Sequence, residues 1–538
     1  MDFDTIVLGT GLSESILAAA LSKAGFKVGH FDANPYYGGD DASLTVDDLR
    51  DWAESRKKNT NTVYLEAQRQ RFSSISLTSS NVPRSRTFSI SLSPTIIPSV
   101  GPLVDSLVAS GVSRYGGFKL LESIAVFDQP SKVKPVPTSK EDVFKNKELS
   151  LVDKRRLMRF LLFAAGEFEG SNELAGQETQ TFLTFLREKF SLANKVADAI
   201  AYALAFCTSP SDLTLPALQR IRRYLRSAGR YGPSPFLVGH YGGIGEIAQG
   251  FCRAAAVNGA TYVLGRNIMS LNPPPKSLGS QANLRWSLSL DDLDEHPSSR
   301  IVAAQPAYIS SSSPSSPGGR SARCVAIINT PIRFSEPPPE LNDDVSVEDI
   351  GPGEIDTGLL IFPPSSVDSG SSTAAASCLI TGEGSMATPS GHWILSFSIP
   401  MSEQDASREP EELLKPYLEA ALTLTSSPSP DSPTKPLLTC YYLQTLPSAN
   451  MVVLSGSPQP LFTVPSDIVV MSETADTAAT HAEEAFWKIV KDLERKGVKP
   501  TKIKSEGEGE RSEEGVGEEP QLITQFWPPL DSVGDDDD

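Results

Sequence analysis

A glycine-rich turn near the N-terminus holds the residues best suited to binding a ligand. The segment GTGLSE (9–14) contains Gly9 and Gly11, follows a strand-like run at 4–8 and precedes a helix-like stretch. Asp32 ends a second strand-like run about 20 residues later. In dinucleotide-binding proteins, such glycines let the backbone approach a pyrophosphate, and the acid binds a ribose hydroxyl. This order of elements predicts a flavoprotein-like βαβ unit.

Two departures from that pattern argue against a bound dinucleotide. Glu14 stands where a third glycine or alanine would pack the helix against the strand, beside the helix N-terminus that would hold the pyrophosphate. The later turn NPYYGGDD (34–41) leads into Asp40 and Asp41, whereas flavin amine oxidases commonly carry a basic residue there. Because fold does not fix function, we expect a vestigial motif that binds neither FAD nor NAD. Its members are Gly9, Gly11, Glu14 and Asp32.

The remaining residue types give no sign of catalysis. The five cysteines and five histidines lie far apart, without a CxxC pair or metal-ligand spacing. No GxSxG or comparable nucleophile motif is present. We therefore expect no catalytic residue, no metal and no disulfide framework, and a reducing, cytosolic setting. The longest apolar runs fall short of the roughly 18 residues that a membrane span needs.

The charge is concentrated at the C-terminal end. The chain of 538 residues has a formal net charge of −18, with 48 Lys or Arg against 66 Asp or Glu. Residues 505–538 alone hold twelve Asp or Glu and one Arg. The rest is only mildly acidic and lacks a basic footprint, which argues against nucleic-acid binding. The acidic start, MDFD, is unlike a secretory signal or a transit peptide.

The hydrophobic pattern predicts an α/β (α+β) fold, in which a flavoprotein-like, multisheet domain is interrupted by an all-helical domain. We expect the flavoprotein-like domain to occupy 1–118 and 230–500, with a mainly helical domain at 119–229 between its two segments. Four tracts rich in Ser and Pro are expected to be disordered loops, near 273–280, 309–321, 363–377 and 425–436. We expect 501–538 to be a disordered acidic tail, except that the apolar island QLITQFWPPLD (521–531) is a candidate docking peptide.

A helix predicted at 245–259 carries a polar stripe. Glu246, Gln249 and Arg253 stand at i, i+3 and i+7, so they share one face of the helix. On spacing alone, such a stripe is most simply a solvated face whose ion pairs are worth a few tenths of a kcal/mol. A binding surface is the alternative.

Two long stretches resemble a known superfamily. Residues 7–39, VLGTGLSESILAAALSKAGFKVGHFDANPYYGG, resemble the first conserved region of the Rab GDP-dissociation inhibitors and Rab escort proteins. Residues 241–268, YGGIGEIAQGFCRAAAVNGATYVLGRNI, resemble the third. Three further stretches, 101–123, 135–163 and 446–458, resemble escort proteins more than dissociation inhibitors. The resemblance implies a non-catalytic accessory subunit, component A of Rab geranylgeranyltransferase, with no FAD or NAD.

The resemblance also implies partners. An escort protein binds a newly made, GDP-bound Rab GTPase and presents it to the catalytic α/β heterodimer of the transferase. It then holds the geranylgeranylated product, including its lipid, and delivers it to membranes through transient contact. Two alternatives stay open: a dissociation inhibitor that recycles prenylated Rabs, and an FAD-dependent oxidoreductase similar to amine oxidases.

Several residues acquire expected roles from the resemblance. The Rab-binding platform would comprise Tyr37, Glu246, Gln249, Arg253, Thr261 and Tyr262. A hydrophobic patch for the Rab C-terminus would comprise Ile96, Ile97, Leu103, Val104 and Leu107, although the same run could equally be core. Phe182 would dock on the transferase α subunit, whereas its spacing from Phe185 and Leu186 alone indicates a core residue. The helical domain would accommodate the geranylgeranyl chain between small residues such as Ala164 and Ala201.

Overall fold

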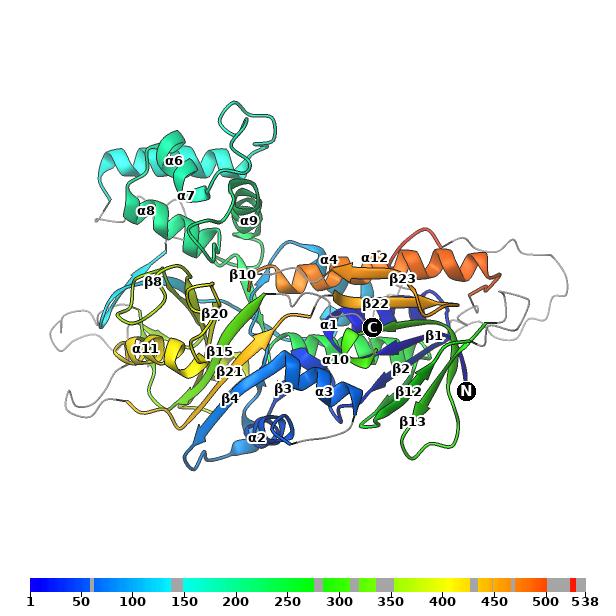
Figure 1. Ribbon diagram of the computed structural model, residues 1–538. Coiled ribbons are helices and arrows are strands. Elements are labelled where there is room, and N and C mark those ends of the chain that lie inside the picture. The colour runs from blue at the N-terminus through cyan, green and yellow to red at the C-terminus, as the bar shows by residue number, and fades with distance from the viewer. Residues whose placement is uncertain are drawn as a thin grey trace, which may run out of the picture.

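The computed structural model describes ten stretches of the chain. They are residues 1–58, 62–136, 149–274, 284–309, 319–334, 353–425, 434–447, 449–465, 470–500 and 523–528. Within them, strands form two large sheets that lie side by side, and a group of helices projects from the sheets (Figure 1). The predicted mixed α and β fold class is confirmed.

The first sheet begins with the predicted βαβ unit. Strands β1 (Asp2–Leu8) and β2 (Val28–Asp32) are parallel, and helix α1 (Leu12–Lys23) joins them. Strand β11 (Thr261–Leu264) adds in parallel beside β2, and β14 (Ser298–Ala304) beside β1. The sheet is completed by β12 (Ile268–Asn272), β13 (Trp286–Leu290), β22 (Ala449–Ser455) and β23 (Pro460–Pro465). Because parallel strands end at the same edge, the glycine turn after β1 lies beside the acid that ends β2.

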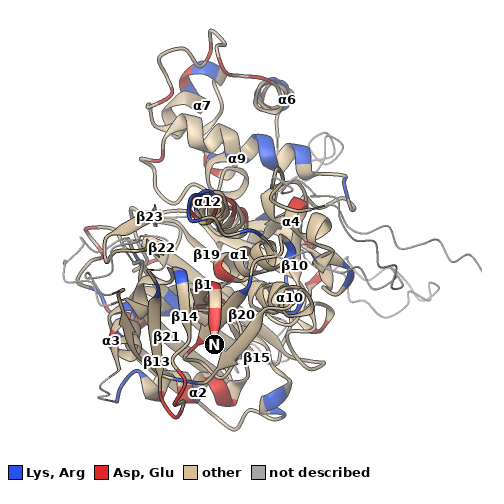
Figure 2. Cartoon of the chain, turned by 90° about the vertical axis from the view of Figure 1, so that its right-hand side faces the viewer, with Lys and Arg blue, Asp and Glu red and all other residues tan. Residues whose placement is uncertain are grey.

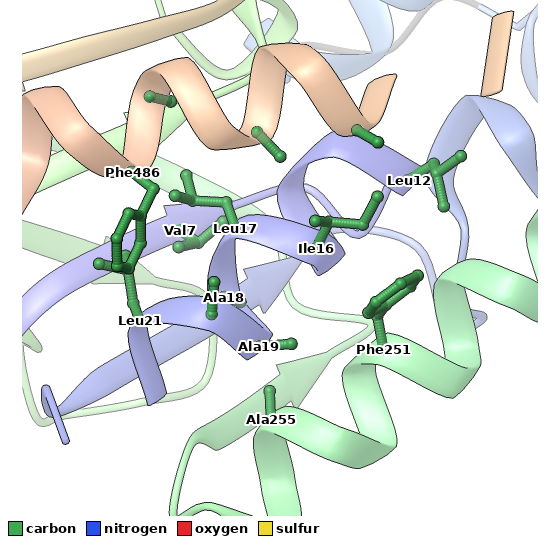
Figure 3. Packing of buried hydrophobic residues seen from close by; sticks show 14 of the residues in the cluster. Val7, Leu12, Ile16, Leu17, Ala18, Ala19, Leu21, Phe251, Ala255 and Phe486 are labelled. Carbon is green, nitrogen blue, oxygen red and sulfur yellow. The ribbon is translucent and has the colours of Figure 1, made fainter. Parts of the chain in front are cut away.

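Helix α1 is buried between other helices. Helices α10 (Ile244–Val257) and α12 (Thr474–Arg495) flank it (Figure 3), and α4 (Pro102–Ser110) packs against α12. The run Ala18–Ala20 is buried in α1, and small side chains allow close packing of neighbouring helices. Because α1 is enclosed on most sides, its sequence is apolar all round rather than amphipathic.

The second sheet is mainly antiparallel. Its order is β4-β21-β15-β20-β19-β18-β8-β9, and the only parallel pair among these described neighbours is β8 with β18. Its strands are β4 (Phe72–Ser79), β8 (Ser123–Gln129), β9 (Lys132–Pro135), β15 (Arg320–Ile328), β18 (Gly358–Phe362), β19 (Ala376–Thr381), β20 (Trp393–Pro400) and β21 (Leu438–Thr445). Helix α11 (Pro410–Leu422) packs on this sheet.

The projecting helices lie within the segment 119–229 that was predicted to be mainly helical. They are α6 (Leu151–Ala165), α7 (Phe182–Phe190), α8 (Asn194–Ala199), a π-helical turn (Ile200–Leu204) and α9 (Thr214–Ser227). Ser150 caps α6, accepting a hydrogen bond of 3.1 Å from the backbone N–H of Asp153. The helices share a hydrophobic core with Leu359 and Leu379 of the second sheet, which fixes their position on it.

Shorter elements connect these layers. They are α2 (Val46–Ser55), α3 (Val63–Arg71), β3 (Ser43–Leu44), β5 (Ile90–Ser91), β6 (Ile97–Pro98), β7 (Phe118–Leu120), β10 (Phe236–Gly239), β16 (Ile332–Arg333) and β17 (Glu354–Ile355).

Two predictions about the organisation of the chain are wrong: where the helices begin, and the disorder of one Ser- and Pro-rich tract. The segment predicted to open the helical domain at 119 instead forms β8 and β9, so the helices begin only at Leu151. The tract 363–377 is an ordered loop, because Ser371 is buried and its hydroxyl donates to Asp405 Oδ2 at 2.6 Å. Most of the other three tracts, and of the acidic tail, lies outside the described residues.

One short piece of the tail is described and packs on the first sheet's helices. Phe526 is 8% exposed, and its ring lies 5.1 Å from that of Phe486 on α12. Trp527 stacks on Phe251 of α10, with ring centroids 6.0 Å apart and an interplanar angle of 25°. Residues 523–528 of the predicted docking peptide therefore dock on the chain itself, which differs from the expectation for the surrounding tail.

Candidate functional site

Side chains of the protein fill the place where a pyrophosphate would meet α1. The Asp41 carboxylate accepts a hydrogen bond of 3.1 Å from the backbone N–H of Leu12, in the first turn of the helix. Gln305 Nε2 donates to Glu14 Oε2 at 3.2 Å. A Cβ built on Gly11 would lie 2.6 Å from Glu14 Oε2 and 2.7 Å from Gln305 Nε2. The backbone that a pyrophosphate would approach is therefore already covered.

Glu14 is tolerated there because its charge is suppressed. The residue is only 3% exposed, and burial raises the pKa of its carboxyl to about 8. The hydrogen bond from Gln305 opposes that shift only in part. A neutral carboxyl avoids the large cost of burying an unpaired charge.

Asp32 is fully engaged by protein donors. The backbone N–H and hydroxyl of Thr10 donate to Oδ2 at 2.8 and 2.6 Å. The backbone N–H and amide of Asn34 donate to Oδ1 at 2.8 and 2.9 Å, and the Tyr308 hydroxyl donates to the same oxygen at 2.8 Å. A carboxylate offers about four acceptor positions, so no acceptor remains for a ribose. The residues present do not fit a dinucleotide.

The predicted polar stripe on α10 is exposed on the surface. Gln249 and Arg253 are exposed and Glu246 is half-buried, whereas Ile247 and Phe251 face the core. The Arg253 guanidinium lies 4.6 Å from the ring centre of Tyr115, which is 58% exposed. The helix therefore buries one face and leaves its polar face available.

Two tyrosines extend this polar face. The rings of Tyr37 and Tyr262 meet edge to face with centroids 6.0 Å apart. The Tyr262 hydroxyl lies 3.0 Å from Nδ1 of His30. Burial lowers the pKa of the His30 imidazole to about 4. Strand β11 presents Thr261, which is exposed, directly before Tyr262.

A hollow of about 380 Å³ opens beside the stripe. It is lined by Tyr37, Glu246 and Gln249, which the sequence analysis predicted to act together. Tyr36, Ser43 and Tyr241 also line it, and sequence reasoning assigned no role to Ser43 or Tyr241. The signal for Tyr241 was its place directly before Gly242 and Gly243 in the second of the two recognisable stretches.

The five residues predicted either as a hydrophobic patch for the Rab C-terminus or as core are buried. They are Ile96, Ile97, Leu103, Val104 and Leu107, and each is at most 4% exposed. The alternative interpretation as core holds, because α4 packs its apolar face against α12. Val108, on the outer side of α4, is 53% exposed.

Phe182 is also a core residue in this structure. It is 1% exposed, and its ring centre lies 6.2 Å from that of Phe160 and 6.4 Å from that of Phe185. A side chain that docks in a partner's pocket must be accessible. In the conformation of this structure, Phe182 is not accessible to a partner. The spacing argument, which indicated core, is the better predictor here.

The small residues predicted to make room for a lipid lie in the core of the helical domain. Ala164 and Ala201 are completely buried within a shared aromatic and aliphatic core. A cavity of about 210 Å³ lies instead where the helices meet both sheets, with Tyr202, Phe206 and Glu14 among its lining residues.

The arginines of α9 pair within the protein. Arg222 and Arg226 contact Glu167 at 3.5 and 2.8 Å, and Arg223 lies 3.4 Å from Asp476. Figure 2 shows basic and acidic residues interspersed over the described chain. The basic helix therefore has internal counter-ions.

The described stretches lack both a metal-binding cluster and a membrane-spanning helix. They hold no group of three His, Cys, Asp or Glu residues that could bind a metal. All five cysteines are buried and unpaired. No described helix is long and apolar enough to cross a membrane.

A family model gives the comparison that decides the classification. The model described as GDI, GDP dissociation inhibitor, matches residues 1–347, more than half of the chain. The chain belongs to the GDP dissociation inhibitor family. The match includes both recognisable stretches, the whole polar stripe of α10 and the helical domain.

Relatives and solved structures agree with that membership. The chain is 32% identical over 411 residues to Rab proteins geranylgeranyltransferase component A of Saccharomyces cerevisiae, covering 75% of this chain and 63% of that protein. The protein of the same name from Drosophila melanogaster is 35% identical over 276 residues, covering 49% and 53%. The chain thus spans less than two thirds of the length of both relatives.

Two solved structures share the fold. A Rab GDI from Plasmodium falciparum matches with a TM-score of 0.63 at 22% identity, covering 90% of this chain and 98% of that one. An oxidoreductase from Methanosarcina mazei matches with a TM-score of 0.52 at 14% identity, covering 90% and 100%. The flavoprotein-like architecture expected from the glycine motif is confirmed.

Proposed function

We propose that this protein is an escort for Rab GTPases. It binds the GDP-bound form, both before and after geranylgeranylation, and presents it to the catalytic transferase heterodimer. Within the family, the names of the curated relatives support component A of the transferase. The exposed stripe Glu246, Gln249 and Arg253, continued by Tyr37, is the observation that carries the proposal.

The proposed role is non-catalytic and needs no dinucleotide. Asp41 hydrogen-bonds the start of α1, Glu14 covers Gly11, and Asp32 is engaged by protein donors. These contacts oppose FAD or NAD binding. Prenyl transfer and its metal chemistry would belong to the heterodimer, and this chain would hold the GTPase, shelter the lipid and release the product at membranes from the cytosol.

A dissociation inhibitor is the second candidate. The burial of Phe182 favours it, because that side chain was the expected contact with the transferase and is not accessible. Such a protein would bind prenylated GDP-bound Rab without supporting prenylation.

Binding to the two nucleotide states tests the proposal. Calorimetry with unprenylated Rab loaded with GDP should give a specific complex, and loading with a non-hydrolysable GTP analogue should weaken it at least tenfold. Equal affinity for both states, or no binding to either, would contradict the proposed recognition of the GDP form.

A further inference from the structure

One wall of the 210 Å³ cavity between the helical domain and the two sheets is a face of the second sheet. Residues that pair across neighbouring antiparallel strands point to the same face of a sheet. Ile361 of β18 pairs with Ser377 of β19, and Ser377 pairs with Ser398 of β20. Ser398 in turn pairs with Arg323 of β15. All four line the cavity, so this row changes across the sheet from apolar to hydroxylated to positively charged.

Arg323 is a cation without an acidic partner. Its Nε donates a hydrogen bond of 3.0 Å to Gln444 Oε1. Its two terminal nitrogens make no hydrogen bond to a described residue, and no described carboxylate forms an ion pair with them. Burial lowers the pKa of the Arg323 guanidinium. Desolvating a cation is costly unless an anion pairs with it, so this wall favours an anion supplied by another molecule.

The acids that line the same cavity do not neutralise Arg323. Asp40 Oδ2 lies 3.0 Å from Arg71 Nη1, so Arg71, the second arginine in the described lining, is paired. Burial raises the pKa of Glu14 to about 8, which keeps that carboxyl neutral near pH 7. Asp41 hydrogen-bonds the start of α1. The unpaired charge of the described lining is therefore on the second sheet, at Arg323.

The other end of the row is apolar. Leu359 and Ile361 of β18 line the cavity together with Tyr202 and Phe206 of the helical domain, and all four belong to one hydrophobic cluster. A protein cavity of about 150 Å³ is large enough to hold benzene. A cavity of about 210 Å³ therefore has room for a ring or a short chain that carries one charged group.

We propose that this cavity binds a small organic carboxylate, whose charge pairs with Arg323 and whose apolar part lies against Ile361, Tyr202 and Phe206. The planar guanidinium matches the two oxygens of a carboxylate, and its terminal nitrogens are available because Gln444 engages only Nε. This site does not rest on the proposed function, because no residue of the polar stripe on α10 lines the cavity.

Benzoate and two related probes test the chemistry of the site on the full chain. Ligand-observed NMR titration should show saturable binding of benzoate. Benzamide has the same shape without the charge, and inorganic phosphate has a charge without the apolar part, so each should bind at least tenfold more weakly. No saturable binding of benzoate up to about 10 mM would overturn the proposal. Benzamide or phosphate binding as tightly as benzoate would also overturn it.

Two variants locate the site. Arg323→Gln removes the charge and should weaken benzoate binding at least tenfold. Its melting temperature should be unchanged or raised, because an unpaired buried charge is lost. Ser398→Leu keeps Arg323 and fills the cavity from the next strand, so it should abolish binding even if Arg323→Gln does not fold. Arg320→Gln is the matched control: Arg320 lies on the same strand, three residues earlier and on the opposite face, and the variant should bind within twofold of the unmodified protein.

The combined result has two readings. Loss of benzoate binding in a folded Arg323→Gln or Ser398→Leu variant, with binding retained in Arg320→Gln, supports the site. Benzoate that binds either folded variant within twofold of the unmodified protein lies elsewhere, and the proposal is then wrong.

Discussion

At the scale of single residues, Glu14 occupies the part of the glycine turn where a dinucleotide-binding protein would hold its ligand. The carboxyl occupies the space above Gly11 and stays neutral because burial raises its pKa to about 8. Sequence spacing predicted the misfit of Glu14, because its position in the glycine pattern is fixed. Gln305 and Tyr308 could not be predicted, because they follow β14 and reach the motif only through the parallel sheet.

The pKa of Glu14 predicts a specific pH dependence of stability. Between the unfolded value near 4.5 and the folded value of about 8, the folded state holds a proton that the unfolded state releases. Stability therefore falls as pH rises through this window. The Glu14→Gln variant should lack that contribution and be more stable than the unmodified protein at pH 8, by up to a few kcal/mol. Thermal melts of both proteins from pH 5 to 8 measure it, and parallel curves would contradict it.

Arg253 provides the residue-scale prediction for the binding face. Its guanidinium is exposed and lies over Tyr115, so it is available to an acidic group of a partner. Arg253→Ala should weaken the binding of GDP-bound Rab, prenylated or not, by about 2–5 kcal/mol, because the charge would be buried and paired in the complex. Arg159→Ala is a matched control, because Arg159 is 64% exposed and lies over Phe190 on the helical domain. An unchanged affinity for Arg253→Ala would refute the assigned face.

At the scale of elements, hydrophobic periodicity predicted the polar and apolar faces of helices, but it did not predict which elements pack against them. It located α10 and its polar stripe within a residue or two, because an amphipathic helix repeats every 3.6 residues. Spacing indicated that Phe182 is core, but it left the run around Leu103 open between core and hydrophobic patch, since burial there depends on what packs against α4. The strands β8 and β9 were missed because β8 pairs with β18, more than 200 residues away in sequence.

The burial of Phe182 changes what its removal should do. Phe182→Ala deletes a ring packed against Phe160 and Phe185, so it should cost about 3–5 kcal/mol of folding stability. Any loss of prenylation support in this variant would then follow from a loosened helical domain. Chemical denaturation measures the change. An unaltered free energy of unfolding would show that Phe182 is not core and would revive its role as a transferase contact.

The docked C-terminal peptide gives a second element-scale prediction. A chain ending at 522 loses Phe526 and Trp527 and exposes the rings of Phe251 on α10 and Phe486 on α12 that they cover, so it should lose about 2 kcal/mol of stability. A chain ending at 528 keeps both rings and should melt like the full chain. Equal stability of the two truncations would show that the peptide contributes nothing to the fold.

At the scale of the whole molecule, the chain combines a flavoprotein-like body, an exposed polar face on α10 and a projecting helical domain. The body was predictable because its glycine turn and strands lie close together in the sequence. The resemblance predicted that Phe182 contacts the transferase, whereas its spacing indicated core, and the residue is buried beneath the side chains of other helices. Family membership is firm for residues 1–347, and the choice between escort and dissociation inhibitor rests on activity.

Reconstituted prenylation decides that choice most directly. Unmodified GDP-bound Rab is incubated with the catalytic heterodimer and geranylgeranyl diphosphate, with and without this protein, and lipid transfer to Rab is measured by mass spectrometry. The account predicts that transfer depends on the protein and that Arg253→Ala lowers it while Arg159→Ala does not. Transfer that is equally slow with and without the protein, although GDP-bound Rab is bound, would contradict the escort function and favour a dissociation inhibitor.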